Sequence, residues 1–327
     1  MALSMVSSAV AISAFLRVEN LADQLNLGSS QLTQSVTGPL YTPPTSLSDA
    51  PIVTASAPFG TRLTGINSPF STTELSIINN ASTSYFEAAG EMLLNGTIKL
   101  PVSTTATPSY SLKANGKLSV IYLGAISCIF CGENRWAMAL ALSRFGNFSQ
   151  LFKGYSSFGD GDVPTIYWRP DEYDSNSSVD IGNFYNSDVI NFISIEYASP
   201  ITAGFQMQTV EYISQYLEGS GSAVYYAAME VITANNNFAG TPYTIWGKLS
   251  VSGADAQVLG NETGVLSIEN MTHDQILDQL SKPADQFAWG EYAAADVYVA
   301  LTCVSLKNVP SVCSLSSIKA IETGAGY

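Results

Sequence analysis

Hydrophobic and polar positions along the chain predict alternating strands and helices. Residues 117–124 and 190–197 are apolar runs of strand character, and residues 133–145, rich in Ala, Leu and Met, have a helical pattern. A hairpin is predicted for residues 241–253, with its turn at Gly247. Strands that alternate with helices in this order are typical of an α/β layer structure.

Capping residues predict where further helices begin. Ser71-Thr-Thr-Glu74 has a capping-box pattern, and the amphipathic stretch that follows predicts one helix through Leu94. Thr272-His-Asp-Gln275 predicts the start of a short helix that ends near Leu280, and residues 287–306 predict a longer one.

The first 70 residues differ in composition from the rest. Residues 1–16 carry no charge, are shorter than a membrane span of about 20 residues, and lack the basic start of a signal peptide. They fit a trimmed signal or anchor, or a hydrophobic end that docks on a partner surface. The stretch after residue 27 is rich in Ser, Thr, Pro and Gly. We therefore divide the chain into residues 1–70, a hydrophobic end and an extended arm suited to self-assembly, and residues 71–327, the α/β domain.

Charge and histidine content exclude several classes of function. The chain has 13 Lys and Arg against 27 Asp and Glu, a formal net charge of −14, which excludes nucleic-acid binding and disfavours anionic membrane surfaces. His273 is the single histidine, and we expect it at the surface. The acidic loop Asp160-Gly-Asp162 lacks the spacing of a calcium loop. We therefore expect no metal and no cofactor.

Sequons and cysteines indicate an oxidising compartment. The four cysteines form two close pairs, and low charge with many polar residues favours an extracellular or cell-surface glycoprotein. The low count of ionised side chains also fits life in strong acid. Six Asn-x-Ser/Thr sequons are candidate glycosylation sites: Asn80, Asn95, Asn147, Asn176, Asn261 and Asn270.

The strongest chemical motif is Cys128-Ile-Phe-Cys131, between a predicted strand and a predicted helix. The N–H groups and dipole of a helix N-terminus stabilise a thiolate at the first cysteine, and the second can resolve a mixed disulfide. No cationic residue separates the two cysteines. The alternatives are a structural disulfide and half of a zinc site, for which the chain has few further ligands. Glu133 fits either a group that shuttles protons or, as we expect, a cap of the first helical turn.

Cys303 and Cys313 bracket a predicted helix end and a turn at Pro310. Nothing around them has a strand-to-helix CxxC pattern, so we expect a structural disulfide. Closing this short loop would stabilise the fold by about 2–3 kcal/mol.

The segment from Val120 to Cys128, with the following Arg135-Trp136 and Leu142-Ser-Arg-Phe-Gly146, resembles a family of exported, thioredoxin-like proteins of thermoacidophilic archaea. This family is catalogued as a domain of unknown function. The resemblance implies a thioredoxin-like fold with a redox CxxC and a C-terminal cysteine pair. The helical stretch at about 200–237 is then an insertion.

The resemblance also implies a cis-proline opposite the CxxC, which Thr241-Pro242 matches at the start of the predicted hairpin. The expected catalytic residues are therefore Cys128, Cys131, Thr241 and Pro242. The function we expect is that of an extracytoplasmic thiol–disulfide oxidoreductase whose substrates are the thiols and disulfides of exported proteins. The alternative is a non-enzymatic surface glycoprotein, or a filament or surface-layer subunit, in which the CxxC is a permanent disulfide.

Overall fold

The computed structural model describes residues 65–98, 103–106, 113–126, 128–156, 163–170, 179–181, 183–197, 243–247, 249–252, 268–269 and 271–324. Their mixture of helices and strands fits the predicted α/β class. Most of the predicted arm and the helical insertion lie outside the described residues. The described end of the arm pairs with the domain, since the N–H groups of Asn67 and Phe70 donate to the carbonyls of Lys153 and Leu151.

A mixed sheet forms the centre of the fold, in the order β1-β11-β10-β3-β9-β7. The neighbours β3 and β9 are parallel, whereas the other pairs along this order are antiparallel, and β2 pairs with β3. The strands are β1 (Ser103–Ala106), β2 (Lys113–Ala114), β3 (Lys117–Ala125), β7 (Val179–Ile181), β9 (Ile190–Tyr197), β10 (Tyr243–Trp246) and β11 (Leu249–Ser252).

The predicted strand at 190–197 and the hairpin with its turn at Gly247 are confirmed. Gly247 has a φ of +72°, a conformation that glycine adopts without steric cost. In the parallel register, Tyr122 lies opposite Ser194 and Gly124 opposite Glu196. These four residues share one face of the sheet because strand side chains alternate.

Two short antiparallel pairs lie beside the main sheet. One joins β5 (Phe152–Ser156) to β6 (Val163–Tyr167), and the other joins β4 (Asn147–Phe148) to β8 (Tyr185–Asn186).

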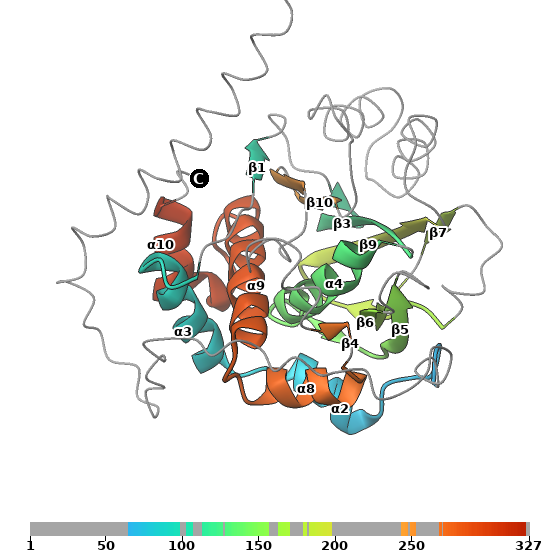
Figure 1. Ribbon diagram of the computed structural model, residues 1–327. Coiled ribbons are helices and arrows are strands. Elements are labelled where there is room, and N and C mark those ends of the chain that lie inside the picture. The colour runs from blue at the N-terminus through green and yellow to red at the C-terminus, as the bar shows by residue number, and fades with distance from the viewer. Residues whose placement is uncertain are drawn as a thin grey trace, which may run out of the picture.

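Two helices are largely buried, α4 (Ile129–Leu142) and α9 (Gln286–Ser305). α4 contacts the β5–β6 hairpin and α9, and α9 contacts β10. Figure 1 shows α3 (Thr83–Leu94) and α10 (Ser316–Gly324) beside α9, with α2 (Thr72–Asn79) and α8 (His273–Ser281) together at the foot of the view. The predicted Cys303–Cys313 disulfide is present and ties the end of α9 to the short helix η2 (Ser311–Ser314).

The helix predicted from the Ser71 capping box to Leu94 is wrong in one respect. The capping box is present, but two helices occupy this stretch. Asn80 ends α2, and Ser82 has an extended backbone before α3 starts. The guanidinium of Arg144 donates to the carbonyl of Ala81 and so holds the break. Residues 80–83, Asn-Ala-Ser-Thr, contain an asparagine that can end one helix and a serine that can cap the start of the next.

The surface position expected for His273 is also wrong. Its side chain is buried at the first position of α8, with Nε2 2.9 Å from the Gly154 carbonyl and 2.8 Å from the Thr165 carbonyl. Burial lowers the pKa of His273 to about 4, so a neutral imidazole links α8 to the β5–β6 hairpin.

Candidate active site

Cys128 lies where the central strand β3 gives way to helix α4. It is the N-cap residue of α4, with an extended backbone at φ −89° and ψ 115°, and its Sγ accepts a hydrogen bond from the Cys131 N–H at 3.3 Å. The sulfur thus occupies the position in which Ser, Thr or Asp oxygens usually cap a helix. Its side chain is partly exposed. An N–H donor and the positive end of a helix dipole stabilise negative charge on such a sulfur.

Cys131 lies one turn further along α4 and is completely buried. Its Sγ accepts a hydrogen bond from the Ala125 N–H at 3.5 Å. Burial raises the pKa of Cys131 well above its usual value, and the neighbouring Cys128 raises it further. Both residues are thiols in the structure. The pair is therefore asymmetric, with one partly exposed cysteine and one buried cysteine.

A buried ion pair lies between α4 and the sheet. The Nε and Nη2 atoms of Arg135 are 2.8 and 2.7 Å from Oε1 of Glu196 on β9, and both side chains are almost wholly inaccessible. The Nη1 group of Arg135 donates to the hydroxyls of Ser156 and Thr165. Hydrogen bonds of this kind offset part of the free-energy cost of burying a charge pair.

Tyrosine rings enclose the guanidinium of Arg135. Its central carbon lies 5.8 Å from the ring centre of Tyr122 and 5.9 Å from that of Tyr167, within the range of cation–π attraction. Burial raises the pKa of Glu196, whereas the charge of Arg135 and the hydroxyl of Tyr122 oppose that rise. The cation of Arg135 lowers the pKa of Cys131, and the carboxylate of Glu196 raises it. The ion pair and the buried thiol are thus electrostatically linked.

Two glycines allow this close packing. A Cβ at Gly132 would lie 2.8 Å from the Ser156 hydroxyl, and a Cβ at Gly124 would overlap the Tyr122 hydroxyl. The first turn of α4 therefore approaches the β5–β6 hairpin closely enough for the Thr165 hydroxyl to donate to the carbonyl of Gly132.

The other residues of α4 are mostly buried. Trp136, Met138, Leu140 and Leu142 belong to the hydrophobic core. Glu133 does not cap α4, because Cys128 does so and Glu133 is buried in the second turn.

Thr241 and Pro242 lie outside the described residues. The strand that follows them in sequence, β10, begins at Tyr243, which pairs with Leu123 near the end of β3 that leads to Cys128.

Sequence reasoning missed the partnership of Arg135 and Glu196. A signal was available, because Arg135 is the one cationic residue of α4 and Glu196 is the one acidic residue of β9. Their pairing depends on the parallel register of β3 and β9, which no local pattern encodes.

The remaining predicted sites fall into two groups. Asn80, Asn95 and Asn147 are exposed, whereas Asn176, Asn261, Asn270 and the acidic residues Asp160 and Asp162 lie outside the described residues. Within the described ranges, His, Cys, Asp and Glu form no cluster of three or more suited to a metal ion. No helix among the described residues has the length and apolar character needed to cross a membrane.

Comparison with known families supports one part of the expected resemblance. Residues 106–248, which include β3, α4 and β10, match a family described as a Domain of unknown function (DUF929). Comparison with curated proteins and with solved structures found no match. The CxxC segment and its buried ion pair thus lie within a region that resembles the domain of unknown function DUF929.

Proposed function

We propose that the protein is a thiol–disulfide oxidoreductase that acts on exported proteins outside the cytoplasm. The observation that carries this proposal is the asymmetric thiol pair at the start of α4. Cys128 is partly exposed and receives an N–H hydrogen bond, while Cys131 is buried one turn deeper. This is the arrangement that a nucleophilic and a resolving cysteine need.

A thioredoxin-like fold is part of the proposal. Supporting it is the strand order β9-β3-β10-β11, in which β3 and β9 are parallel and β10 and β11 form an antiparallel hairpin. The CxxC helix follows β3, and α9 comes after the hairpin in the chain. A βαβ unit with the CxxC at its helix, followed by a hairpin and a helix, is the arrangement of thioredoxin-like domains.

The proposed reaction has two exchange steps. The Cys128 thiolate attacks a sulfur of the substrate disulfide, so that a mixed disulfide forms and the second substrate sulfur leaves with the electron pair of the broken bond. Cys131 then loses its proton and attacks Cys128 Sγ, which releases the first substrate sulfur as a thiolate. Two electrons pass from the protein dithiol to the substrate, and the reverse sequence oxidises a substrate dithiol.

The second step requires that a buried thiol lose a proton. Burial opposes this loss, because a thiolate in an apolar site is poorly solvated. The positive charge of Arg135 favours the thiolate of Cys131, whereas the carboxylate of Glu196 disfavours it. The charge state of the buried pair therefore sets how readily Cys131 resolves the mixed disulfide.

The exported location has support of its own. The Cys303–Cys313 disulfide is typical of an oxidising compartment. The exposed asparagines of the sequons at Asn80, Asn95 and Asn147 fit a glycoprotein.

Reduction of insulin disulfides by dithiothreitol, with and without the purified protein, tests the activity. We expect the wild type to accelerate reduction and Cys128→Ser to abolish the acceleration, whereas Cys131→Ser should accumulate a mixed disulfide with the substrate. A wild type no faster than Cys128→Ser would overturn the enzyme proposal. The protein would then be better described as a surface glycoprotein or an assembly subunit whose CxxC is structural.

A further inference from the structure

The three described sequons differ in how their acceptor atoms are engaged. An N-glycan is transferred to the side-chain amide of asparagine, and the sequon must lie in a surface loop that the transferase can reach. The asparagines of all three sequons are exposed. Exposure alone therefore does not separate them, but their middle residues and hydrogen bonds do.

The sequon Asn95-Gly96-Thr97 has all three of its residues exposed. Asn95 is the C-cap of α3, and its Oδ1 accepts a hydrogen bond from the Thr97 N–H at 2.9 Å. This contact closes an Asx-turn, a local fold that Asn forms readily. Gly96 has a φ of +76°, and no atom lies within 4 Å of the position where its Cβ would be. Nothing in the described part of the chain thus covers this turn.

The Asn95 turn is also fixed at both ends. The Asn95 N–H donates to the Glu91 carbonyl, and the N–H of the buried Ile98 donates to the Met92 carbonyl. The Oδ1 atom of Asn95 is engaged in the turn, whereas its Nδ2 atom has no hydrogen bond among the described residues. The acceptor nitrogen thus belongs to an exposed residue in a turn that backbone hydrogen bonds hold at both ends.

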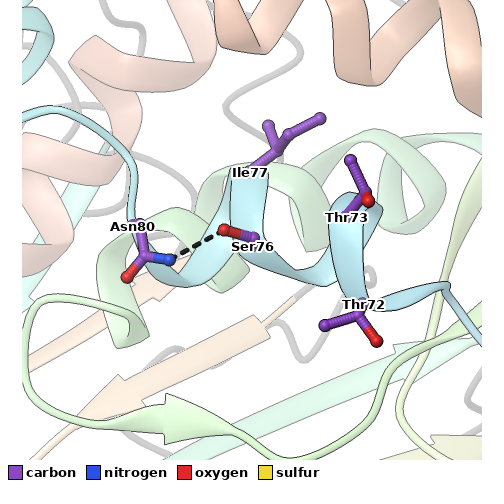
Figure 2. Close-up of a pocket in the computed structure, with 5 residues that line it drawn as sticks. All are labelled: Thr72, Thr73, Ser76, Ile77 and Asn80. Carbon is purple, nitrogen blue, oxygen red and sulfur yellow. Dashed lines mark hydrogen bonds between the residues drawn. The ribbon is translucent and has the colours of Figure 1, made fainter.

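In the other two sequons, side chains are buried or hydrogen-bonded to the rest of the fold. The Asn80 Nδ2 group donates to the Ser76 hydroxyl at 2.8 Å (Figure 2), and both residues line a surface pocket along α2. The middle residue of that sequon, Ala81, is buried.

Asn147 lies in β4, its middle residue Phe148 is buried, and the Ser149 hydroxyl donates to the Phe184 carbonyl. Recognition of Asn147 would require β4 to leave β8.

We propose that Asn95 is the preferred N-glycan acceptor among the three described sequons, and that its donor is an oligosaccharide on a polyprenyl phosphate or diphosphate carrier. Asn95 Nδ2 forms a bond to the anomeric carbon of the first sugar, and the bond from that carbon to the carrier phosphate breaks. The phosphate leaves with the electron pair, and the amide proton passes to a base of the transferase. In the cell this inference rests on the exported location within the proposed function, and it does not depend on the thiol chemistry.

The test is transfer in vitro to the folded, unglycosylated full chain by an oligosaccharyltransferase with a lipid-linked oligosaccharide. Site occupancy is read by mass spectrometry of proteolytic peptides. Thr97→Ala, Ser82→Ala and Ser149→Ala each remove one sequon hydroxyl and keep the backbone N–H, so the Asx-turn can persist in Thr97→Ala. Thr97→Ser makes all three sequons end in serine and removes any preference of the transferase for threonine.

We expect Asn95 to have the highest occupancy of the three in both the wild type and Thr97→Ser. Only Thr97→Ala should lose that modification. Synthetic peptides of the three sequons, all ending in serine, should be modified to similar extents, because the fold then contributes nothing. Occupancy of Asn80 or Asn147 at or above that of Asn95 in the folded chain, or an unmodified Asn95, would overturn the proposal. This test measures glycan mass, so it can contradict the Asn95 proposal while the insulin assay supports thiol–disulfide exchange. The two assays can also give the opposite pair of results.

Discussion

The thiol site and the helical cluster of α3, α9 and α10 bury ionisable groups in opposite ways. Beneath the CxxC, Glu196 contacts Arg135 directly, and the hydroxyls of Ser156 and Thr165 accept hydrogen bonds from Nη1 of the guanidinium. In the helical cluster, Asp296 on α9 is completely buried near Gly90 on α3 and Ser317 on α10 and makes no salt bridge among the described residues.

Burial raises the pKa of Asp296 well above its usual value, and the charge of Glu87 raises it further, whereas that of Arg144 opposes the rise. The comparison indicates that a buried carboxylate stays charged in this fold where a cation contacts it, as Arg135 contacts Glu196. A buried carboxyl group without such a contact, like that of Asp296, favours its neutral form. Four predictions test that contrast.

The largest effect should follow from breaking the buried ion pair. Arg135→Met leaves Glu196 without its cation and should cost about 3–5 kcal/mol of unfolding free energy. The double variant Arg135→Met/Glu196→Met removes both charges and should recover most of the loss. Urea denaturation measures both. Equal losses in the single and double variants would show that packing, rather than charge compensation, dominates here.

The next effect concerns His273, whose pKa is lowered to about 4 by burial. An unfolded histidine has a pKa of about 6.5, so the unfolded chain takes up a proton at a higher pH than the folded one. The stability that the neutral imidazole contributes is present above about pH 6.5 and is lost as the pH falls towards 4.

The loss of unfolding free energy between about pH 6.5 and about pH 4 should amount to about 3 kcal/mol, because that is the free energy that corresponds to the difference between the folded and unfolded pKa values of His273. Urea denaturation between pH 7 and about pH 4 measures it. His273→Gln retains a polar side chain but does not titrate, and should flatten that part of the profile. If the unfolding free energy of His273→Gln falls with pH as steeply as that of the wild type, the loss is not due to His273.

The disulfide of the helical cluster should contribute somewhat less. Cys303→Ser/Cys313→Ser should lower the unfolding free energy by about 2–3 kcal/mol, because the short closed loop restricts the unfolded chain. The matched change at the other cysteine pair, Cys128→Ser, should alter stability little and abolish thiol exchange. Thermal unfolding together with the insulin assay tests whether one cysteine pair is structural and the other is the pair that exchanges disulfides.

The smallest effect should come from Asp296→Asn at acidic pH. Because the folded pKa of Asp296 is raised, its contribution to stability is fully present below the unfolded pKa and is lost as the pH rises through the folded pKa. The variant should therefore gain stability relative to the wild type as the pH rises. If the difference in unfolding free energy between Asp296→Asn and the wild type does not change with pH, Asp296 does not titrate in this way.

Local patterns predicted much of the fold, and long-range pairings account for most of the errors. The Ser71 and Thr272 capping boxes and the β10–β11 hairpin are encoded within a few residues, and all are present. The position of Cys128 follows from a strand that runs into a helix. His273 was misplaced because its burial depends on a hairpin more than 100 residues earlier in the chain. The contact of Arg135 with Glu196 likewise depends on how two distant segments pair.

The burial of Cys131 has a practical consequence for following the dynamics of this chain. With Cys303 and Cys313 oxidised, a small alkylating reagent can modify only Cys128 until the first turn of α4 opens. The rate at which a second alkyl group is added therefore reports how often that turn detaches from the sheet, in the manner of hydrogen exchange. The native sequence thus contains its own kinetic probe of local opening at the helix start, with no engineered label.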